Sequence, residues 1–215
     1  MRFLIVSGGE ATDEFVEEVI KRGGYDVILA ADSGMDFLYR TKILPDIIVG
    51  DFDSVDPEVL EFFREHEEID ICALNPVKDD TDTEFAIRES IRRGATEITI
   101  IGGTGTRLDH VLGNISLLGI GLEEDVRMEL LDANNRIRMT DHSVVLKKKQ
   151  QYGKYLSLLP YSEKVTGVTL KGVKYPLDSY TMGGFNSLGI SNEIVDEEAS
   201  IELKSGRLLV IESRD

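Results

Sequence analysis

PDIIVGDFDS, residues 45–54, joins a short apolar run to two aspartates that are separated by one residue. The run Ile47–Gly50 predicts a buried strand, because continuous apolar residues suit a parallel sheet covered on both faces. Asp51 and Asp53 follow at its carboxyl end, where doubly wound sheets bind ligands. If the backbone stays extended, both carboxylates point the same way and need a cation between them. Oxygen ligands of this kind favour Mg²⁺. The alternative is a turn with helix-capping aspartates, because a helix is expected from Asp56-Pro57.

Similar apolar runs recur on both sides of this strand. They predict strands at Arg2–Ser7, Asp26–Ala31, Ile47–Gly50, Ile69–Leu74, Glu97–Ile101 and Arg127–Leu131. Helical spacing of apolar residues predicts helices at Asp13–Arg22 and Asp56–Glu65, and Thr81–Glu84 fits a capping box that opens another. Alternating strands and helices predict a parallel-sheet, Rossmann-like α/β domain over residues 1–135.

The pattern changes after about residue 143, where apolar residues alternate at period two. Val165–Leu170 is one example, and residues 201–210 predict a hairpin that turns at Ser205-Gly206. No convincing helix is expected in this part of the sequence. We therefore predict an all-β sandwich domain over residues 140–215, with the boundary between Asp132 and Ser143.

Composition excludes several classes of protein. With 41% hydrophobic and 30% charged residues, the sequence is ordinary for a globular protein, and it holds no apolar run of 18 residues that would cross a membrane. Its amino terminus, MRFLIVSGGE, resembles a buried strand more than a signal peptide. The single cysteine, Cys72, agrees with a reducing compartment, so we expect a cytoplasmic protein. A net charge of −16 argues against nucleic acid and anionic membranes as partners, whereas a cationic substrate would be attracted.

A second acidic cluster follows the strand that is expected to end near Leu74. It reads KDDTD, residues 78–82, and lies at another strand-to-helix junction. Asp82 could join Asp51 and Asp53 in holding a metal, and Lys78 could contact a phosphate as a point charge. Helix capping is the plain alternative, and it accounts for Thr81.

Two further strand exits carry residues suited to a nucleotide. Gly102-Gly103 follows a strand and lets the backbone approach a ligand, while the next helix offers unpaired N–H groups to phosphate. This turn is neither a Walker A loop nor G-x-G-x-x-G, but Arg107 beside it suits bidentate phosphate binding. Asp32 adds another acid at the end of an earlier strand. We expect these exits to converge at one edge of the sheet.

Taken in order, these blocks resemble thiamine pyrophosphokinase. The matching segments are ADSG (31–34), PD with GDFDS (45–54), KDDTD (78–82), GG with RLDH and Asn114 (102–114), and, more weakly, GISNE (189–193). The resemblance implies an amino-terminal domain that binds Mg-ATP and a carboxy-terminal β-sandwich that binds thiamine. It also implies a homodimer, with the thiamine site at the subunit interface.

The same resemblance implies a reaction and a set of roles. The hydroxyl of thiamine attacks the β-phosphorus of ATP and releases AMP. The expected metal ligands are Asp51, Asp53 and Asp82; the ATP contacts are Asp32, Ser33, Lys78, Thr81, Arg107 and His110; the substrate contacts are Asp109, Asn114, Ser191 and Asn192. Asp109 would orient thiamine or accept its proton, with His110 as the alternative. The sequence has no tryptophan, so an aromatic partner for thiamine would be Tyr or Phe.

Three other functions are compatible with parts of this pattern. A related pyrophosphokinase could act on a pterin alcohol with the same metal and ATP residues. A D-x-D glycosyltransferase would need a nucleotide-sugar pocket. A binding module without turnover would be expected to lack a metal carboxylate, yet every expected acid is present.

Overall fold

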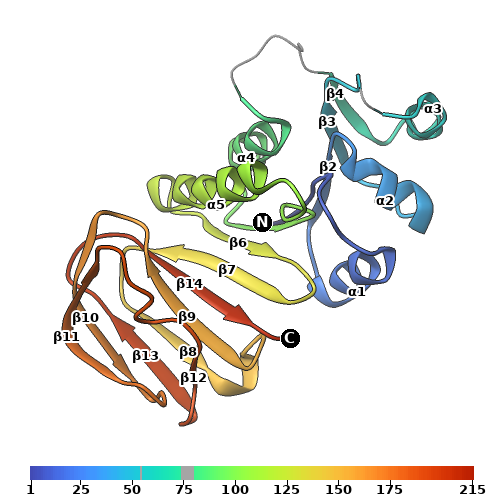
Figure 1. The fold of residues 1–215 in the computed structure, drawn as a ribbon. Helices are drawn as coiled ribbons and strands as arrows, with labels where there is room; N and C mark the ends of the chain where they lie inside the picture. The colour runs from blue at the N-terminus through green and yellow to red at the C-terminus, as the bar shows by residue number, and fades with distance from the viewer. Residues whose placement is uncertain (54, 74–79) are drawn as a thin grey trace. The chain divides into compact units, whose positions relative to one another are not determined.

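The structure, a computed structural model, describes residues 1–53, 55–73 and 80–215. Over these residues the chain divides into two compact units, Met1–Ala133 and Asn134–Asp215 (Figure 1).

The first unit is built on a parallel sheet. Among the described residues its strands follow the spatial order β6-β5-β1-β2-β3-β4, and every neighbouring pair is parallel. Their bounds are β1 Arg2–Val6, β2 Val27–Ala31, β3 Ile47–Gly50, β4 Asp70–Ala73, β5 Glu97–Ile101 and β6 Arg127–Leu131. The sequence predicted all six to within one residue at each end, because a local apolar run marks each of them.

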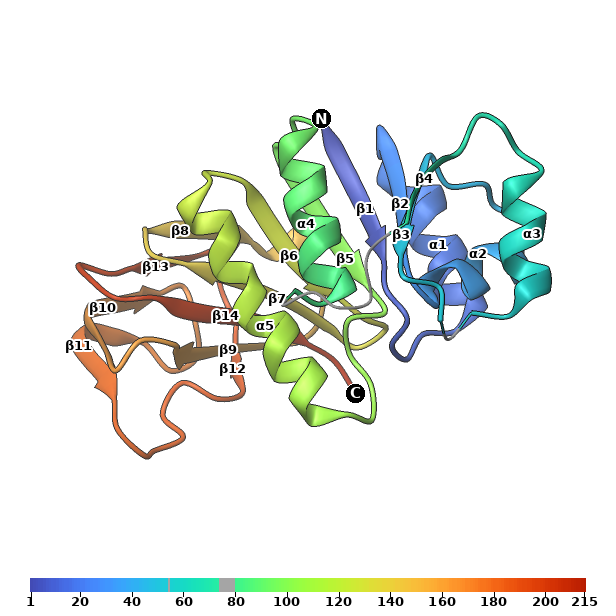
Figure 2. The same cartoon turned by 90° about the horizontal axis from the view of Figure 1, so that it is seen from above.

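Helices cover both faces of this sheet. They are α1 Asp13–Gly23, α2 Gly34–Thr41, α3 Pro57–Arg64, α4 Asp82–Arg92 and α5 Leu108–Glu123. Figures 1 and 2 show α4 and α5 on one face and α1, α2 and α3 on the other. Residues 3–6 of β1 are fully buried between them. Among the described helices, none has both the length and the apolar character needed to cross a membrane. Helix α2 was not predicted.

The order of the strands creates a divergence beside β1. From β1 the chain proceeds outward through β2, β3 and β4, and then returns to add β5 on the opposite side of β1. The connections that leave β1 and β5 therefore run in opposite directions. Open α/β sheets bind ligands at such a point, outside the carboxyl ends of the strands.

The second unit holds two antiparallel sheets. One has the order β12-β9-β14-β7 and the other β11-β10-β13-β8. The bounds are β7 Asn135–Thr140, β8 Val144–Lys147, β9 Tyr155–Pro160, β10 Lys164–Lys171, β11 Leu177–Gly183, β12 Asn192–Glu193, β13 Glu198–Glu202 and β14 Leu208–Ser213, with a 3₁₀ turn at Lys148–Gln150. One apolar core contains side chains of both sheets, including Leu158 and Val210 from the first and Leu170 and Ile201 from the second. This is the two-sheet arrangement expected of a β-sandwich.

The hairpin predicted for residues 201–210 is wrong. Strand β13 pairs with β10 and β8, whereas β14 pairs with β7 and β9 in the other sheet. The turn at Ser205-Gly206 thus carries the chain from one sheet to the other. Period-two alternation predicts that a strand has one buried face, but both sheets of a sandwich bury one face, so the pattern does not identify the partner.

Candidate active site

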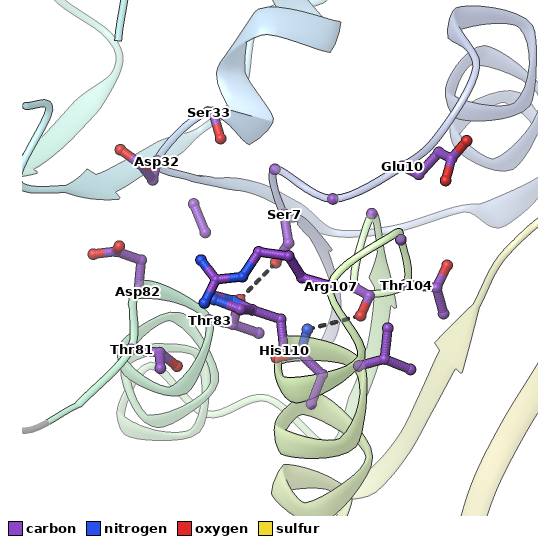
Figure 3. A pocket seen from close by; sticks show the side chains of 18 of the residues that line it. Ser7, Glu10, Asp32, Ser33, Thr81, Asp82, Thr83, Thr104, Arg107 and His110 are labelled. Atoms are coloured by element: carbon purple, nitrogen blue, oxygen red, sulfur yellow. Dashed lines mark hydrogen bonds between the residues drawn. The ribbon is translucent and has the colours of Figure 1, made fainter. Parts of the chain in front are cut away.

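A cavity of about 490 Å³ opens in the first unit at the carboxyl ends of β1, β2 and β5. Its lining consists of residues 7–10, 31–33, 81–83, 102–107, 110, 111 and 114. Figure 3 shows Asp32 and Asp82 along one side of this pocket, with Glu10 and Thr104 along the opposite side. The pocket therefore lies where the connections from β1 and β5 diverge.

Two glycine loops form the floor of the pocket. The loop after β1 bonds to the loop after β5, because Gly9 N–H donates to the Gly102 carbonyl and Glu10 N–H to the Thr104 carbonyl, both at 2.7 Å. A Cβ atom on Gly9 would lie under 3.0 Å from those same two carbonyl oxygens. Only a residue without a side chain lets the loops approach this closely.

The sequence predicted the loop after β5 but missed the loop after β1. The lining residues that it missed include Ser7, Gly8, Gly9 and Glu10, together with Thr83 and Val111. Their signal was present, because an apolar run is followed there by Ser7 and then by two glycines, much as Gly102 and Gly103 follow the run that ends at Ile101. The position of β1 in the centre of the sheet is what gives this loop its importance.

The amino terminus of α4 presents Thr81 and Asp82 to the pocket. Thr81 caps the helix, since its side chain accepts the N–H of Glu84 at 3.2 Å. The reciprocal half of the predicted capping box is replaced by a bond from Arg88 to the Glu84 carboxylate. One residue further on, the Thr83 hydroxyl is 3.0 Å from the hydroxyl of Ser7 (Figure 3). This bond ties the start of α4 to the end of β1.

The exit of β2 places Asp32 and Ser33 beside the pocket, as predicted. Asp32 has a left-handed φ of 47°, and its N–H donates to the carbonyl of Val49 at 2.8 Å. Ser33 stands at the N-cap position of α2, although its side chain makes no capping hydrogen bond.

The expectation of an extended backbone at Asp51–Asp53 is wrong. Phe52 between them has a left-handed φ of 61°, and the carboxylate of Asp51 accepts the N–H of Asp53 at 3.2 Å. The segment is an Asx turn, a structure that aspartate favours because its short side chain reaches the backbone two residues ahead. Capping of α3 comes instead from Asp56, which accepts the N–H of Glu58 at 2.9 Å. Asp51 and Asp53 do not line the pocket itself.

The aspartates that follow neighbouring strands nevertheless affect one another through their negative charges. The pKa of Asp53 is raised above its ordinary value, chiefly by the negative charge of Asp51, with smaller contributions from Asp32 and Asp82. Among the described residues, no three His, Cys, Asp or Glu side chains are arranged to hold a metal ion together. The carboxylates are thus close enough to repel one another, without forming a closed coordination shell.

Arg107 and Asp109 form an exposed ion pair at the start of α5. The guanidinium Nη2 is 2.7 Å from the Asp109 carboxylate, and the two side chains are 69% and 66% exposed. The hydrogen bond from Arg107 lowers the pKa of Asp109 to about 2. Arg107 and His110 both line the pocket, and Asn114 also reaches it, donating to the carbonyl of Gly103 at 2.7 Å. This last bond fixes the glycine loop to α5.

Two further predicted residues, Ser191 and Asn192, belong to the second unit. Lys78 is outside the described residues. Ser191 is exposed in the second unit, and its N–H donates to the hydroxyl of Ser157 at 3.0 Å. Asn192 is only 4% exposed, and its side chain accepts from the N–H of Tyr175 and donates to the carbonyl of Tyr175. Asn192 therefore fixes the backbone of Tyr175, a role that its position in the sequence does not reveal.

Two family models match separate parts of the chain. The model described as the thiamin pyrophosphokinase catalytic domain matches residues 23–130. The model described as the vitamin B1 binding domain of thiamin pyrophosphokinase matches residues 141–208.

Individual proteins give the same result. The chain is 33% identical over 190 residues to thiamine pyrophosphokinase of Bacillus subtilis (strain 168), a match that covers 87% of each sequence. It superposes on the crystal structure of thiamine pyrophosphokinase from Bacillus subtilis with a TM-score of 0.90 and 28% identity, covering all of both chains. For thiamin pyrophosphokinase from Geobacillus thermodenitrificans the TM-score is 0.87 at 30% identity, over 100% of this chain and 98% of that one.

Proposed function

We propose a Mg-ATP mechanism for this chain, which belongs to the thiamin pyrophosphokinase family. That membership makes it a diphosphotransferase that forms thiamine diphosphate. In the proposed reaction the thiamine hydroxyl oxygen bonds to the β-phosphorus of ATP. The bond from that phosphorus to the oxygen bridging the α-phosphate breaks, AMP leaves, and the hydroxyl proton passes to water.

The observation that carries this proposal is the pocket between the exits of β1 and β5. Its paired glycine loops let the backbone approach a ligand closely, and Arg107 and His110 line it at the amino terminus of α5, where a helix favours phosphate. We interpret the first unit as a Rossmann-like fold, since the strand order reverses its direction beside β1. ATP phosphates would lie over the loops, contacted by Ser33, Thr81, Arg107 and His110. Lys78 would add a further charge.

The metal would be held by Asp51, Asp53 and Asp82, with Asp32 and Thr81 near its waters. The donor set fits Mg²⁺, because it consists of oxygens alone and because the negative charge of Asp51, which raises the pKa of Asp53, is one that a bound cation would offset. Mg²⁺ commonly uses one or two carboxylates and completes its shell with water and substrate phosphates. Carboxylates that do not form a complete coordination shell by themselves are compatible with this mode of Mg²⁺ binding. When bound, the metal would supply neutralisation of phosphate charge during transfer.

Asp109 suits orientation of the thiamine hydroxyl better than proton acceptance. A carboxylate whose pKa is about 2 is a weak base near neutral pH, and the bond from Arg107 that lowers it also fixes its direction. Arg107 is therefore proposed to serve two groups, the phosphate oxygens and Asp109. Negative charge that develops on the bridging oxygen would be stabilised by its guanidinium.

The thiamine side of the site is proposed for the β unit. Ser191 would bind the pyrimidine ring, while Asn192 would act through the Tyr175 backbone that it fixes. We retain two domains, 1–135 for Mg-ATP and 140–215 for thiamine, in a cytoplasmic homodimer whose subunit interface holds thiamine. The resemblance to the family supports these assignments.

The decisive experiment follows AMP release. The protein is incubated with Mg-ATP and, separately, with thiamine, a pterin alcohol and a sugar acceptor. AMP that forms only when thiamine is the acceptor supports the proposal. AMP that forms with the pterin alcohol or the sugar instead would show that thiamine is not the substrate. Tight binding of ATP and thiamine without any AMP would reveal a binding module and would contradict the mechanism.

A further inference from the structure

The second unit contains a cavity that the proposed reaction does not use. It measures about 490 Å³, and the residues that line it all lie between positions 148 and 214. Three of them are cations, Lys148, Lys154 and Arg214, and one is an acid, Glu193. The lining is therefore positive, although the whole chain carries a net charge of −16.

The loop that forms one wall is held by a buried ion cluster. Glu212 of β14 is 1% exposed and lies 2.7 Å from a guanidinium nitrogen of Arg136, with Arg138 on the same carboxylate. Its other oxygen accepts the N–H of Tyr152 at 3.1 Å. Gly153 follows, and a Cβ atom there would overlap the backbone of Ser213. The loop thus packs directly against β14, so the cavity wall is fixed before any ligand arrives.

The cations come from three segments and face one volume. The Lys148 ammonium donates to the carbonyl of Val195 at 3.2 Å, which uses one of its three donors. The Lys154 ammonium lies 3.8 Å from Glu193, too far for a strong hydrogen bond. The guanidinium carbon of Arg214 is 4.8 Å from the centroid of the Tyr152 ring.

Glu193 already has a closer partner outside the cavity lining. Its carboxylate is 3.0 Å from the ammonium of Lys174, whose hydrogen bond is the main reason that the pKa of Glu193 is low. The positive charges of Lys148 and Lys154 lower it further. One carboxylate shared among three lysines leaves an excess of positive charge at this site.

We propose that this basic cavity binds the phosphoryl group of a small anion, with Lys148, Lys154 and Arg214 as its donors. Lysine and arginine pair with phosphate through short, charge-assisted hydrogen bonds. A polyanion such as nucleic acid would be repelled by the acidity of the rest of the chain, whereas a single phosphate can enter the pocket alone. The site shares no residue with the pocket of the first unit and does not depend on the proposed function.

The test is a titration of the full-length protein, followed by ¹H–¹⁵N NMR at the amides of Gly153 and Lys154. Inorganic phosphate and methyl phosphate are the two probes, and they distinguish free phosphate from a phosphate ester. Saturable shifts at these amides with either probe are expected. The double variant Lys148→Gln/Lys154→Gln should weaken binding at least about tenfold, the effect of losing one charge-assisted bond or more.

Two further variants separate the proposal from a general effect of charge. Lys149→Gln removes a neighbouring charge that does not line the cavity, and it should bind phosphate as the wild type does. Glu193→Gln removes the one acid and should tighten binding. Equal affinity in the wild type and the double variant, identical shifts with potassium chloride, or shifts confined to residues 102–107 would overturn the proposal. AMP formation in the double variant should match the wild type, so the proposed function is tested separately.

Discussion

Replacing Gly9 by alanine tests how the active-site pocket is held together. In the structure the loops after β1 and β5 are joined by the bonds Gly9 N–H to Gly102 O and Glu10 N–H to Thr104 O. The new Cβ atom would lie under 3.0 Å from both acceptor oxygens, a separation that a real methyl group does not adopt. Both acceptors belong to backbone, so the loops must separate.

The expected cost follows from the two bonds. A net contribution of about 1 kcal/mol for each gives a loss of about 2 kcal/mol in the free energy of unfolding. For a chain of this length, that loss corresponds to a fall in Tm of about 4–8 °C. The apparent KM for ATP should rise as well, because separating the two loops changes the shape of the pocket in which the phosphates are proposed to bind.

Circular dichroism at 222 nm is a suitable assay, because the described α-helices all lie in the unit Met1–Ala133. Gly113→Ala is the matched control, since Gly113 lies within α5 and a Cβ atom there meets nothing within 4 Å. The control should gain about 0.5–1 kcal/mol, because alanine suits a helix interior better than glycine. If Gly9→Ala unfolds within about 0.5 kcal/mol of the wild type, the steric reasoning is refuted.

Three further predictions concern charged residues. Asp53→Asn should abolish diphosphate transfer at saturating Mg²⁺ without loss of the helix signal in circular dichroism. The control Asp125→Asn, in the exposed turn after α5, should keep full activity. Near-normal turnover of Asp53→Asn would contradict the metal assignment. Arg107→Ala should return the pKa of Asp109 from about 2 to its ordinary range, measured by ¹³C NMR of the carboxyl group, and an unchanged midpoint would exclude the ion pair. Glu89, 8% exposed between Arg92 and Arg93, has a pKa lowered to about 2, first by the bond from Arg92, so Glu89→Gln should cost about 2 kcal/mol at pH 7. A carboxyl group whose pKa is lowered by folding stabilises the fold only while it is ionised. The difference in free energy of unfolding between Glu89→Gln and wild type should therefore vanish as pH falls from 4.5 toward 2. A difference that does not change with pH would refute this prediction.

The sequence predicted those parts of the site that depend on local pattern. Thr81 caps α4 as expected, since a cap needs only a hydroxyl and an N–H three residues apart. Asp32 directly follows β2 and Arg107 directly precedes α5, so the local patterns that mark the ends of these elements were enough to place both residues at the pocket. At Asp51–Asp53 the sequence allowed either an extended backbone or a turn, and the turn is what forms, although Asp56 and not these two aspartates caps α3.

By itself, the sequence determined which segments become strands and helices, and that acids and glycines follow the strands of the first unit. Burial, helix periodicity and capping act over a few residues, so a single sequence carries their signals. The tertiary structure decided which exits become neighbours. It placed β1 between β2 and β5, which brought Ser7 and Gly9 to the pocket, and it assigned β13 and β14 to different sheets. Pairing between distant strands depends on the whole packed arrangement, and an alternating or apolar pattern is the same whichever strand lies beside it.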